Sequence, residues 1–362
     1  MLALGPWTDH RQDPAGWAAS LGVSRAAVDL YLGSDVLDLH LDTFIWTRLF
    51  GYDLTKRHGL GPTGGRFLGQ ADLPRLREAQ VGGGIFVITT NPLRGGAGRA
   101  AAFGRNLERL RSILGSVPGQ VQLVRTAGDY RAARAEGRFA AFLGIQGGNA
   151  VDHPGALDLI DDDERGHASI VRVTLVHLSS SGLGGTSSPL GPARGLSDSG
   201  RDFVRRLNAR KIFVDLAHIS RQGFWDALEA HDKSQPAIVT HTGVSSVHPH
   251  WRNLDDMQIR AIANTGGTVG VMYQSSFLGD PLFAGKAESV VRHLEHLINV
   301  GGEECAALGS DWDGMIVPPR DMPTCLELPR LVEKMLARGW SEARIRGVLG
   351  GNFLRSLRAL RG

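Results

Sequence analysis

The sequence predicts an α/β protein, a (β/α)8 barrel of the TIM type with an N-terminal helical extension and C-terminal helices. Short apolar runs rich in β-branched residues recur about eight times, and most are separated by a segment of helix length. Strands that alternate with helices pair in parallel, and about eight of them favour a closed barrel. The chain has 362 residues, of which 42% are hydrophobic and 21% charged, and this suits one barrel with added helices.

The predicted elements follow one another with turn residues between them. The strands are bounded by Gly, Asp, Ser or Pro and are predicted at 36–42, 84–90, 139–146, 170–177, 211–218, 237–241, 268–273 and 306–311. Apolar residues at helical spacing predict helices over 13–32, 74–80, 197–208, 287–298, 328–337 and 342–360. Glycine-rich segments at 61–69, 95–98 and 182–195 are expected to be loops, which build active sites in this fold.

We expect one domain over 1–362, with residues 1–34 as the extension and 35–362 as the barrel, because no repeat or linker divides the chain. A net charge of +3 without a long basic run argues against nucleic-acid binding. Cys305 and Cys325 are the only cysteines, which excludes a cysteine-rich zinc site. No stretch approaches the ~18 apolar residues of a membrane span. We therefore expect a cytoplasmic protein without a membrane partner, and a homodimer is one state open to it.

Seven chemically active side chains fall at or just past the C-terminal ends of predicted strands. His40 and Asp42 alternate on the first strand and therefore share a face. The others follow later strands and are Gln146, His177, His218, His241 and Asp311. Such strand ends converge on the mouth of a barrel, where the catalytic groups of this fold lie. Imidazole and carboxylate ligands suit Zn²⁺, with Mn²⁺, Fe²⁺ or Co²⁺ as alternatives, so the sequence predicts a metal site at the mouth.

Several short segments share a further pattern when they are taken in chain order. These segments are 38–42, 72–76, 173–177, 214–220, 239–241, 251–253, 309–314 and 351–354. Together they resemble the membrane (renal-type) dipeptidases, zinc peptidases of the amidohydrolase superfamily, over nearly the whole chain from about residue 35. The resemblance implies a metal-dependent hydrolase that cleaves dipeptides or related small amides with a metal-activated water.

The resemblance also implies a metal centre and exposes a departure from it. His40 and Asp42 would hold one zinc ion, and His218 and His241 would hold a second. The family places a bridging glutamate where this chain has Gln146. An amide offers one neutral oxygen, and its NH₂ group would point hydrogens at the second metal. We therefore predict that Gln146 is one of the metal-site residues but that the centre holds its cations weakly or holds only one.

Three residues would carry the chemistry that the resemblance implies. Asp311 would be the general acid/base that takes a proton from the water and passes it to the leaving amine. His177 would donate a hydrogen bond to the scissile carbonyl oxygen as negative charge develops there. Arg252, in the loop after the His241 strand, would bind the terminal carboxylate of the substrate through its planar guanidinium.

Two other functions stay open. A catalytically weakened or non-catalytic relative with one metal or none would bind a small ligand in the same pocket. A dinucleotide-dependent oxidoreductase is favoured only by the glycines at 96–98, which resemble a phosphate-binding turn but do not directly follow a strand end. No Gly-x-Ser-x-Gly follows a predicted strand, which argues against a serine hydrolase.

Overall fold

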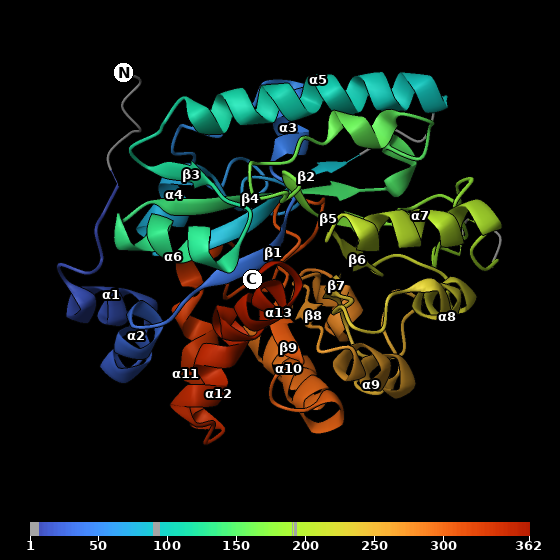
Figure 1. The fold of residues 1–362 in the computed structure, drawn as a ribbon. Coiled ribbons are helices and arrows are strands. Elements are labelled where there is room, and N and C mark those ends of the chain that lie inside the picture. Colours follow the sequence, from blue (N-terminus) through green and yellow to red (C-terminus); the bar gives the residue numbers. More distant parts are fainter. Residues whose placement is uncertain (1–6, 90–94, 190, 192–193) are drawn as a thin grey trace.

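The strands of the computed structural model form a parallel barrel (Figure 1). The structure describes residues 7–89, 95–189, 191 and 194–362, and nine strands lie within these ranges. They are β1 (Leu37–Leu41), β2 (Gly83–Thr89), β3 (Val121–Leu123), β4 (Phe139–Gln146), β5 (Ile170–Thr174), β6 (Phe213–Asp215), β7 (Val239–Thr242), β8 (Val269–Val271) and β9 (Ala306–Leu308). Strands β1, β2, β4, β5 and β6 pair in that order, and β7, β8 and β9 form a second group.

Two isolated parallel bridges join these groups into a ring. Asp215 at the end of β6 pairs with Ile238 before β7, and Leu41 at the end of β1 pairs with Trp312 beyond β9. Eight strands therefore close the barrel, as the sequence predicts. Strand β3 lies outside the ring and pairs with the start of β4. It was not predicted, because its three residues carry too short a pattern to be recognised.

Helices alternate with the strands and surround them (Figure 1). The α-helices are α1 (Pro14–Leu21), α2 (Arg25–Leu32), α3 (Phe44–Phe50), α4 (Leu73–Glu78), α5 (Gly96–Gly115), α6 (Ala127–Ala135), α7 (Asp198–Ala209), α8 (Arg221–Ala230), α9 (Asp256–Asn264), α10 (Ala287–Gly301), α11 (Pro329–Ala337), α12 (Glu342–Arg346) and α13 (Asn352–Arg361). Short helical turns are η1 (Gly148–Ala150), η2 (Ala156–Leu159), η3 (Ser275–Leu278), η4 (Cys325–Glu327) and η5 (Gly347–Gly351). The N-terminal helices pack beside α11.

Two predicted helices are interrupted at glycine. The predicted helix over 13–32 ends at Gly22, whose φ of +65° closes α1, and α2 begins after the N-cap Ser24. The predicted helix over 342–360 contains the π turn η5 between α12 and α13. A side chain at Gly350 would lie 2.6 Å from the backbone oxygen that precedes β1, so this turn needs glycine to pack against the barrel.

One predicted loop is wrong in part. The segment 95–98 is not a loop, because Gly95 is the N-cap of α5 and the helix begins at Gly96. In segment 61–69, and in the described part of 182–195, the structure contains no helix or extended strand, as expected. The predicted strand at 84–90 corresponds to β2, and its last residue lies outside the described residues.

Helix α13 covers the end of the barrel at which the strands begin. Phe353 packs against Phe142 and Phe213, with ring centroids 6.3 Å and 5.8 Å apart, inside a buried apolar cluster that fills the ring. The Arg361 guanidinium donates hydrogen bonds to backbone carbonyls just before β5 and β6 and to the first residue of β5. The opposite end, where the strands finish, therefore remains for polar side chains.

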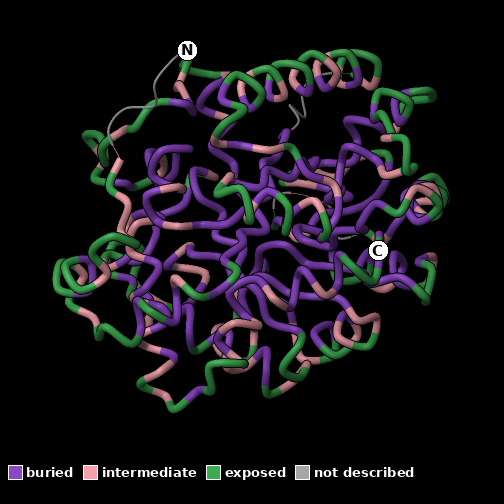
Figure 2. Tube along the Cα trace, turned by 60° about the vertical axis from the view of Figure 1, so that its left-hand side comes forward, coloured by how far each residue is buried: buried purple, intermediate pink, exposed green. Residues whose placement is uncertain are grey.

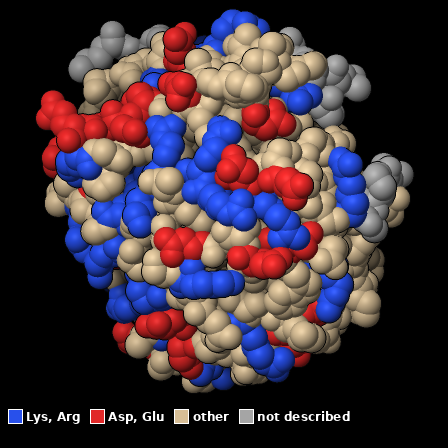
Figure 3. Space-filling model, turned by 45° about the vertical axis from the view of Figure 1, so that its right-hand side comes forward, with Lys and Arg blue, Asp and Glu red and all other residues tan. Residues whose placement is uncertain are grey.

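The surface carries charges of both signs. Figure 2 shows buried residues through the centre of the molecule and exposed residues on outer loops and helix faces. On the face drawn in Figure 3, basic and acidic side chains are interspersed. Ion pairs are frequent along the chain, and Arg165, for example, pairs with Asp129 and Asp163. Among the described residues, no helix is both long enough and apolar enough to cross a membrane.

Candidate metal centre

The predicted metal ligands come together where the strands end. His40 lies on β1 and Asp42 directly after it, while His241 lies on β7. His218 and Asp311 each lie three residues beyond a strand, and both have a φ of +64°. Left-handed backbone is costly for residues with a side chain and is concentrated at functional sites. These two turns bring an imidazole and a carboxyl group back over the barrel mouth.

Three buried side chains form the centre of this cluster. One ligand atom each from His40, His241 and Asp311 lie within 4.8 Å of one another. Nε2 of His40 is 3.4 Å from Oδ2 of Asp42 and 3.7 Å from Oδ1 of Asp311. The same Nε2 is buried and has no hydrogen-bond partner among the described residues. The cluster thus offers two imidazoles and two carboxyl groups, and one imidazole nitrogen lacks a hydrogen bond within the described residues. This donor set suits a divalent cation.

His218 extends the cluster toward Gln146. Nε2 of His218 lies 2.8 Å from Nε2 of His241 and 3.1 Å from Nε2 of Gln146. The Thr89 hydroxyl lies 2.8 Å from Oδ1 of Asp42 and 3.1 Å from Oε1 of Gln146. The amide therefore has its oxygen toward Thr89 and its nitrogen toward His218. In this orientation Gln146 offers hydrogens, not a lone pair, to the place where the histidine nitrogens converge.

Burial keeps the imidazoles of the cluster neutral. It lowers the pKa of His218 and His241 well below the ordinary histidine value, and neighbouring cationic groups lower both further. Burial lowers the pKa of His40 as well, and the guanidinium of Arg172 adds to the effect. Neutral imidazole is the form that binds a metal. Asp311 shifts the other way, because burial and the nearby Asp42 raise its pKa well above the usual carboxyl value.

Arg252 and His177 flank the cluster. Nη2 of Arg252 donates a hydrogen bond to the backbone oxygen of His241 at 2.8 Å, and the residue is buried. A pocket of about 350 Å³ opens beside them and is lined by Arg252, His218 and Trp251. The ring of His177 stands edge-on to that of His218 with centroids 4.7 Å apart. All eight predicted site residues thus lie in one connected group at the mouth, and their roles stay predictions.

Comparison with known families identifies the chain. The model of the membrane dipeptidase family, peptidase family M19, matches residues 24–361. The chain belongs to the membrane dipeptidase family.

Relatives of this M19 chain agree with that assignment. An uncharacterised protein from the pqqA 5′ region of Klebsiella pneumoniae is 31% identical over 268 residues, which are 70% of this chain and 94% of that protein. A solved metallopeptidase of family M19, dipeptidase AC, is 27% identical with a TM-score of 0.74 and covers 91% of this chain and 99% of its own. A Rhodobacter sphaeroides metallopeptidase, solved with a phosphinate mimic of the dipeptide L-Ala-D-Ala, is 26% identical with a TM-score of 0.75. The match covers 90% of this chain and 99% of that metallopeptidase.

Arg172 and Asp215, two charged residues that the sequence analysis did not select, hold the histidines of the M19 centre in place. Nη2 of Arg172 lies 2.8 Å from Nδ1 of His40, and Nη1 of Arg172 lies 3.2 Å from Oδ2 of Asp215. The Thr240 hydroxyl lies 2.8 Å from the same Asp215 oxygen and 2.9 Å from Nδ1 of His241. Both charged residues are fully buried in strands that are otherwise apolar. A charged residue inside an apolar run is the sequence signal that could have identified them.

These contacts set where the ring protons lie. If the Thr240 hydroxyl donates to Asp215, its oxygen accepts from Nδ1–H of His241, and Nε2 of that ring is free to bind a cation. Arg172 can only donate, so Nδ1 of His40 accepts, and the proton of the neutral ring lies on Nε2. Cation binding at Nε2 of His40 therefore requires this ring to relocate or release its proton. The donor set fits a divalent cation once that proton has left Nε2 of His40.

Proposed function

We propose that this chain is a divalent-metal-dependent hydrolase that cleaves dipeptides or related small amides. The observation that carries the proposal is the convergence of imidazole and carboxyl groups at the barrel mouth beside a pocket that contains a buried arginine. Membership of the M19 family supports it, and the ligand of the Rhodobacter sphaeroides relative is a dipeptide mimic.

In this proposal four side chains hold the metal, and zinc is the first candidate. They are His40, Asp42, His218 and His241. A divalent cation in such a site supplies Lewis acidity, which brings the pKa of water toward neutrality. Burial excludes bulk water from the cluster and strengthens the electrostatic interactions within it.

Asp311 is the proposed proton carrier. Burial and Asp42 raise its pKa well above the usual carboxyl value, which favours a group that takes up a proton from water and then passes it to a leaving amine. Oδ1 of Asp311 is 3.7 Å from Nε2 of His40, and this distance supports a role for the carboxyl group beside the proposed metal ligands.

His177 and Arg252 are proposed to bind and orient the substrate. Burial lowers the pKa of His177 to about 4, so its ring is neutral and donates one N–H, here to the amide carbonyl oxygen. The Arg252 guanidinium is proposed to bind the terminal carboxylate in the pocket that it lines.

The test is hydrolysis by zinc-loaded protein of a dipeptide panel that includes L-Ala-D-Ala. We expect Asp311→Asn to lower kcat by about 100-fold or more, as for the loss of a general acid/base. Asp202→Asn is the matched control, because Asp202 is exposed on α7 away from the mouth. The proposal fails if the loaded protein cleaves no dipeptide and Asp311→Asn behaves like Asp202→Asn.

A second function, a weakened or non-catalytic relative that binds a small ligand, is favoured by one contact. The Gln146 amide nitrogen is 3.1 Å from Nε2 of His218, in the place where a bridging carboxylate would screen two cations. This alternative predicts less than one metal per chain by elemental analysis and ligand binding that survives a chelator. Metal-dependent turnover would exclude the non-catalytic form of this alternative.

A further inference from the structure

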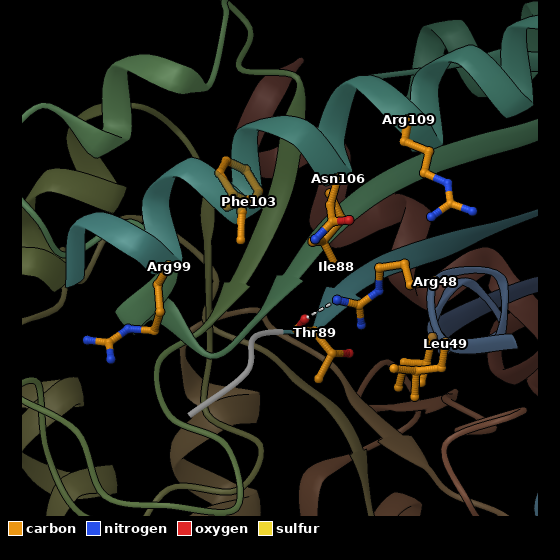
Figure 4. Close-up of a pocket in the computed structure, with 10 residues that line it drawn as sticks. Arg48, Leu49, Ile88, Thr89, Arg99, Phe103, Asn106 and Arg109 are labelled. Carbon is orange, nitrogen blue, oxygen red and sulfur yellow. Dashed lines mark hydrogen bonds between the residues drawn. The ribbon is translucent and has the colours of Figure 1, made fainter. Parts of the chain in front are cut away.

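A second pocket, of about 450 Å³, lies at the C-terminal end of β2 between α3 and α5 (Figure 4). Arg48 reaches it from α3, and Arg99 and Arg109 reach it from α5. In Figure 4, Arg48 and Arg109 stand on one side and Arg99 on the other. Every other described lining residue is uncharged, so the wall of the pocket carries three guanidinium groups and no carboxylate.

Arg48 and Arg109 bind only neutral groups of the described chain. Nη1 of Arg48 donates to the backbone oxygen of Thr89, and Nη2 of Arg109 donates to that of Thr47, both at 2.9 Å. Within the described ranges neither arginine has a carboxylate at ion-pair distance. Nε of Arg48 is buried without a hydrogen-bond partner in that part of the chain. Arginines elsewhere commonly pair with acids, as Arg338 does with Glu288.

The positive charges of Arg48 and Arg109 repel each other. Burial lowers the pKa of Arg48, the carboxylate of Asp42 opposes this lowering, and the positive charge of Arg109 adds to it by a smaller amount. An anion placed between the two guanidiniums would relieve the repulsion and satisfy their remaining N–H groups. Planar guanidinium forks bind carboxylate and phosphate oxygens in pairs, which makes both groups suitable occupants.

This pocket adjoins the metal centre. Thr89 lines it, and the Thr89 hydroxyl contacts both Asp42 and Gln146. Gln146 in turn contacts His218, which lines the pocket of Arg252. The two pockets therefore flank the cluster, with the Thr89 and Gln146 side chains between them.

We propose that the pocket of Arg48 and Arg109 binds the anionic group, carboxylate or phosphate, of a small molecule. A volume of about 450 Å³ lies within the ordinary range for small-molecule sites. The anion has two possible sources. It is the acidic side chain of a dipeptide whose backbone lies over the metal centre, which rests on the proposed function, or it is a separate small anion.

Calorimetric titration of the full-length protein with inorganic phosphate, and separately with glutarate, tests the site itself. We expect Arg109→Gln and Arg48→Gln each to weaken binding roughly tenfold or more, because each removes a charge-assisted hydrogen bond. Arg105→Gln is the control, because it removes the same charge from an exposed position of α5 that does not line the pocket. Arg109 is exposed, so its variant should fold, and thermal melting verifies this. Equal affinities for Arg109→Gln and Arg105→Gln would overturn the proposal.

The source of the anion is decided by kinetics. If it belongs to the substrate, the protein prefers Ala-Glu or Glu-Ala over the Gln-containing isostere in kcat/KM, and Arg109→Gln removes that preference. If it is a separate anion, Arg109→Gln loses phosphate binding, and the ratio of kcat/KM between the acidic dipeptide and its Gln-containing isostere stays unchanged. A chain that hydrolyses no dipeptide would refute the proposed function, whereas arginine-dependent phosphate binding would still support the pocket.

Discussion

Replacing Gln146 with Glu should tighten the binding of a second divalent cation. The two side chains have the same shape, so the substitution changes charge without repacking the buried site. In the structure the Gln146 nitrogen is 3.1 Å from Nε2 of His218, which is itself 2.8 Å from Nε2 of His241. A carboxylate would turn an anionic oxygen toward the same point.

The expected size of the effect follows from charge and burial. Attraction between a single negative and a double positive charge about 4 Å apart is ~8 kcal/mol at an effective dielectric constant of about 20. Ionising the buried carboxyl group so that it can face the cation costs several kcal/mol, for which ~5 is a reasonable value. The difference of about 3 kcal/mol corresponds to roughly 100-fold tighter binding of the cation.

The assay is metal content per chain after dialysis against a fixed free zinc concentration, measured together with dipeptide turnover. Gln122→Glu is the matched control, because it makes the same change on β3, outside the ring of the barrel. We expect both metal content and turnover to rise for Gln146→Glu and not for Gln122→Glu. Metal content equal to that of the unsubstituted protein would refute this reasoning. If the unsubstituted protein turns over dipeptides rapidly and Gln146→Glu is slower, Gln146 belongs to a different mechanism.

Three further outcomes are expected. Because Asp311 carries a raised pKa, zinc binding should release protons and should become tighter as pH rises. Calorimetry in buffers of different ionisation enthalpy measures the number of protons released. A zinc titration that releases no proton would contradict the prediction. Burial lowers the pKa of His293 to about 4 from 6.5, so the free energy of unfolding should be up to ~3 kcal/mol higher above about pH 6.5, and this gain should vanish as pH falls toward 4. Urea unfolding of His293→Gln at a series of pH values should lack this rise between pH 4 and 6.5. A pH profile equal to that of the unsubstituted protein would refute the prediction. Gly309→Ala should lower both the melting temperature and metal content, because its Cβ would lie 1.7 Å from the Thr240 oxygen. Gly115→Ala is the control, because its Cβ meets no atom within 4 Å beyond its own helix, and it should lower neither.

The predicted site residues could be found from sequence because each one ends a local pattern. An apolar run followed by a histidine or aspartate, as at His40 and His218, is visible without knowing which strands pair. Parallel strands in a barrel place all such ends on one side, so the group as a whole was predictable. The residues beneath it were not. Arg172 and Asp215 lie inside strands, where the same patterns indicate only burial.

The sequence by itself determined the class of fold, the family and the residues that gather at the barrel mouth. Apolar periodicity and short motifs are properties of neighbouring residues, and they persist in the unfolded chain. Only the tertiary structure decided that His40 faces His241 and Asp311, that the Gln146 nitrogen points at His218, and that Arg48 and Arg109 share a pocket. These contacts join side chains from elements far apart in the sequence. They exist only once the strands have paired into a closed ring, because ring closure sets the distances between them.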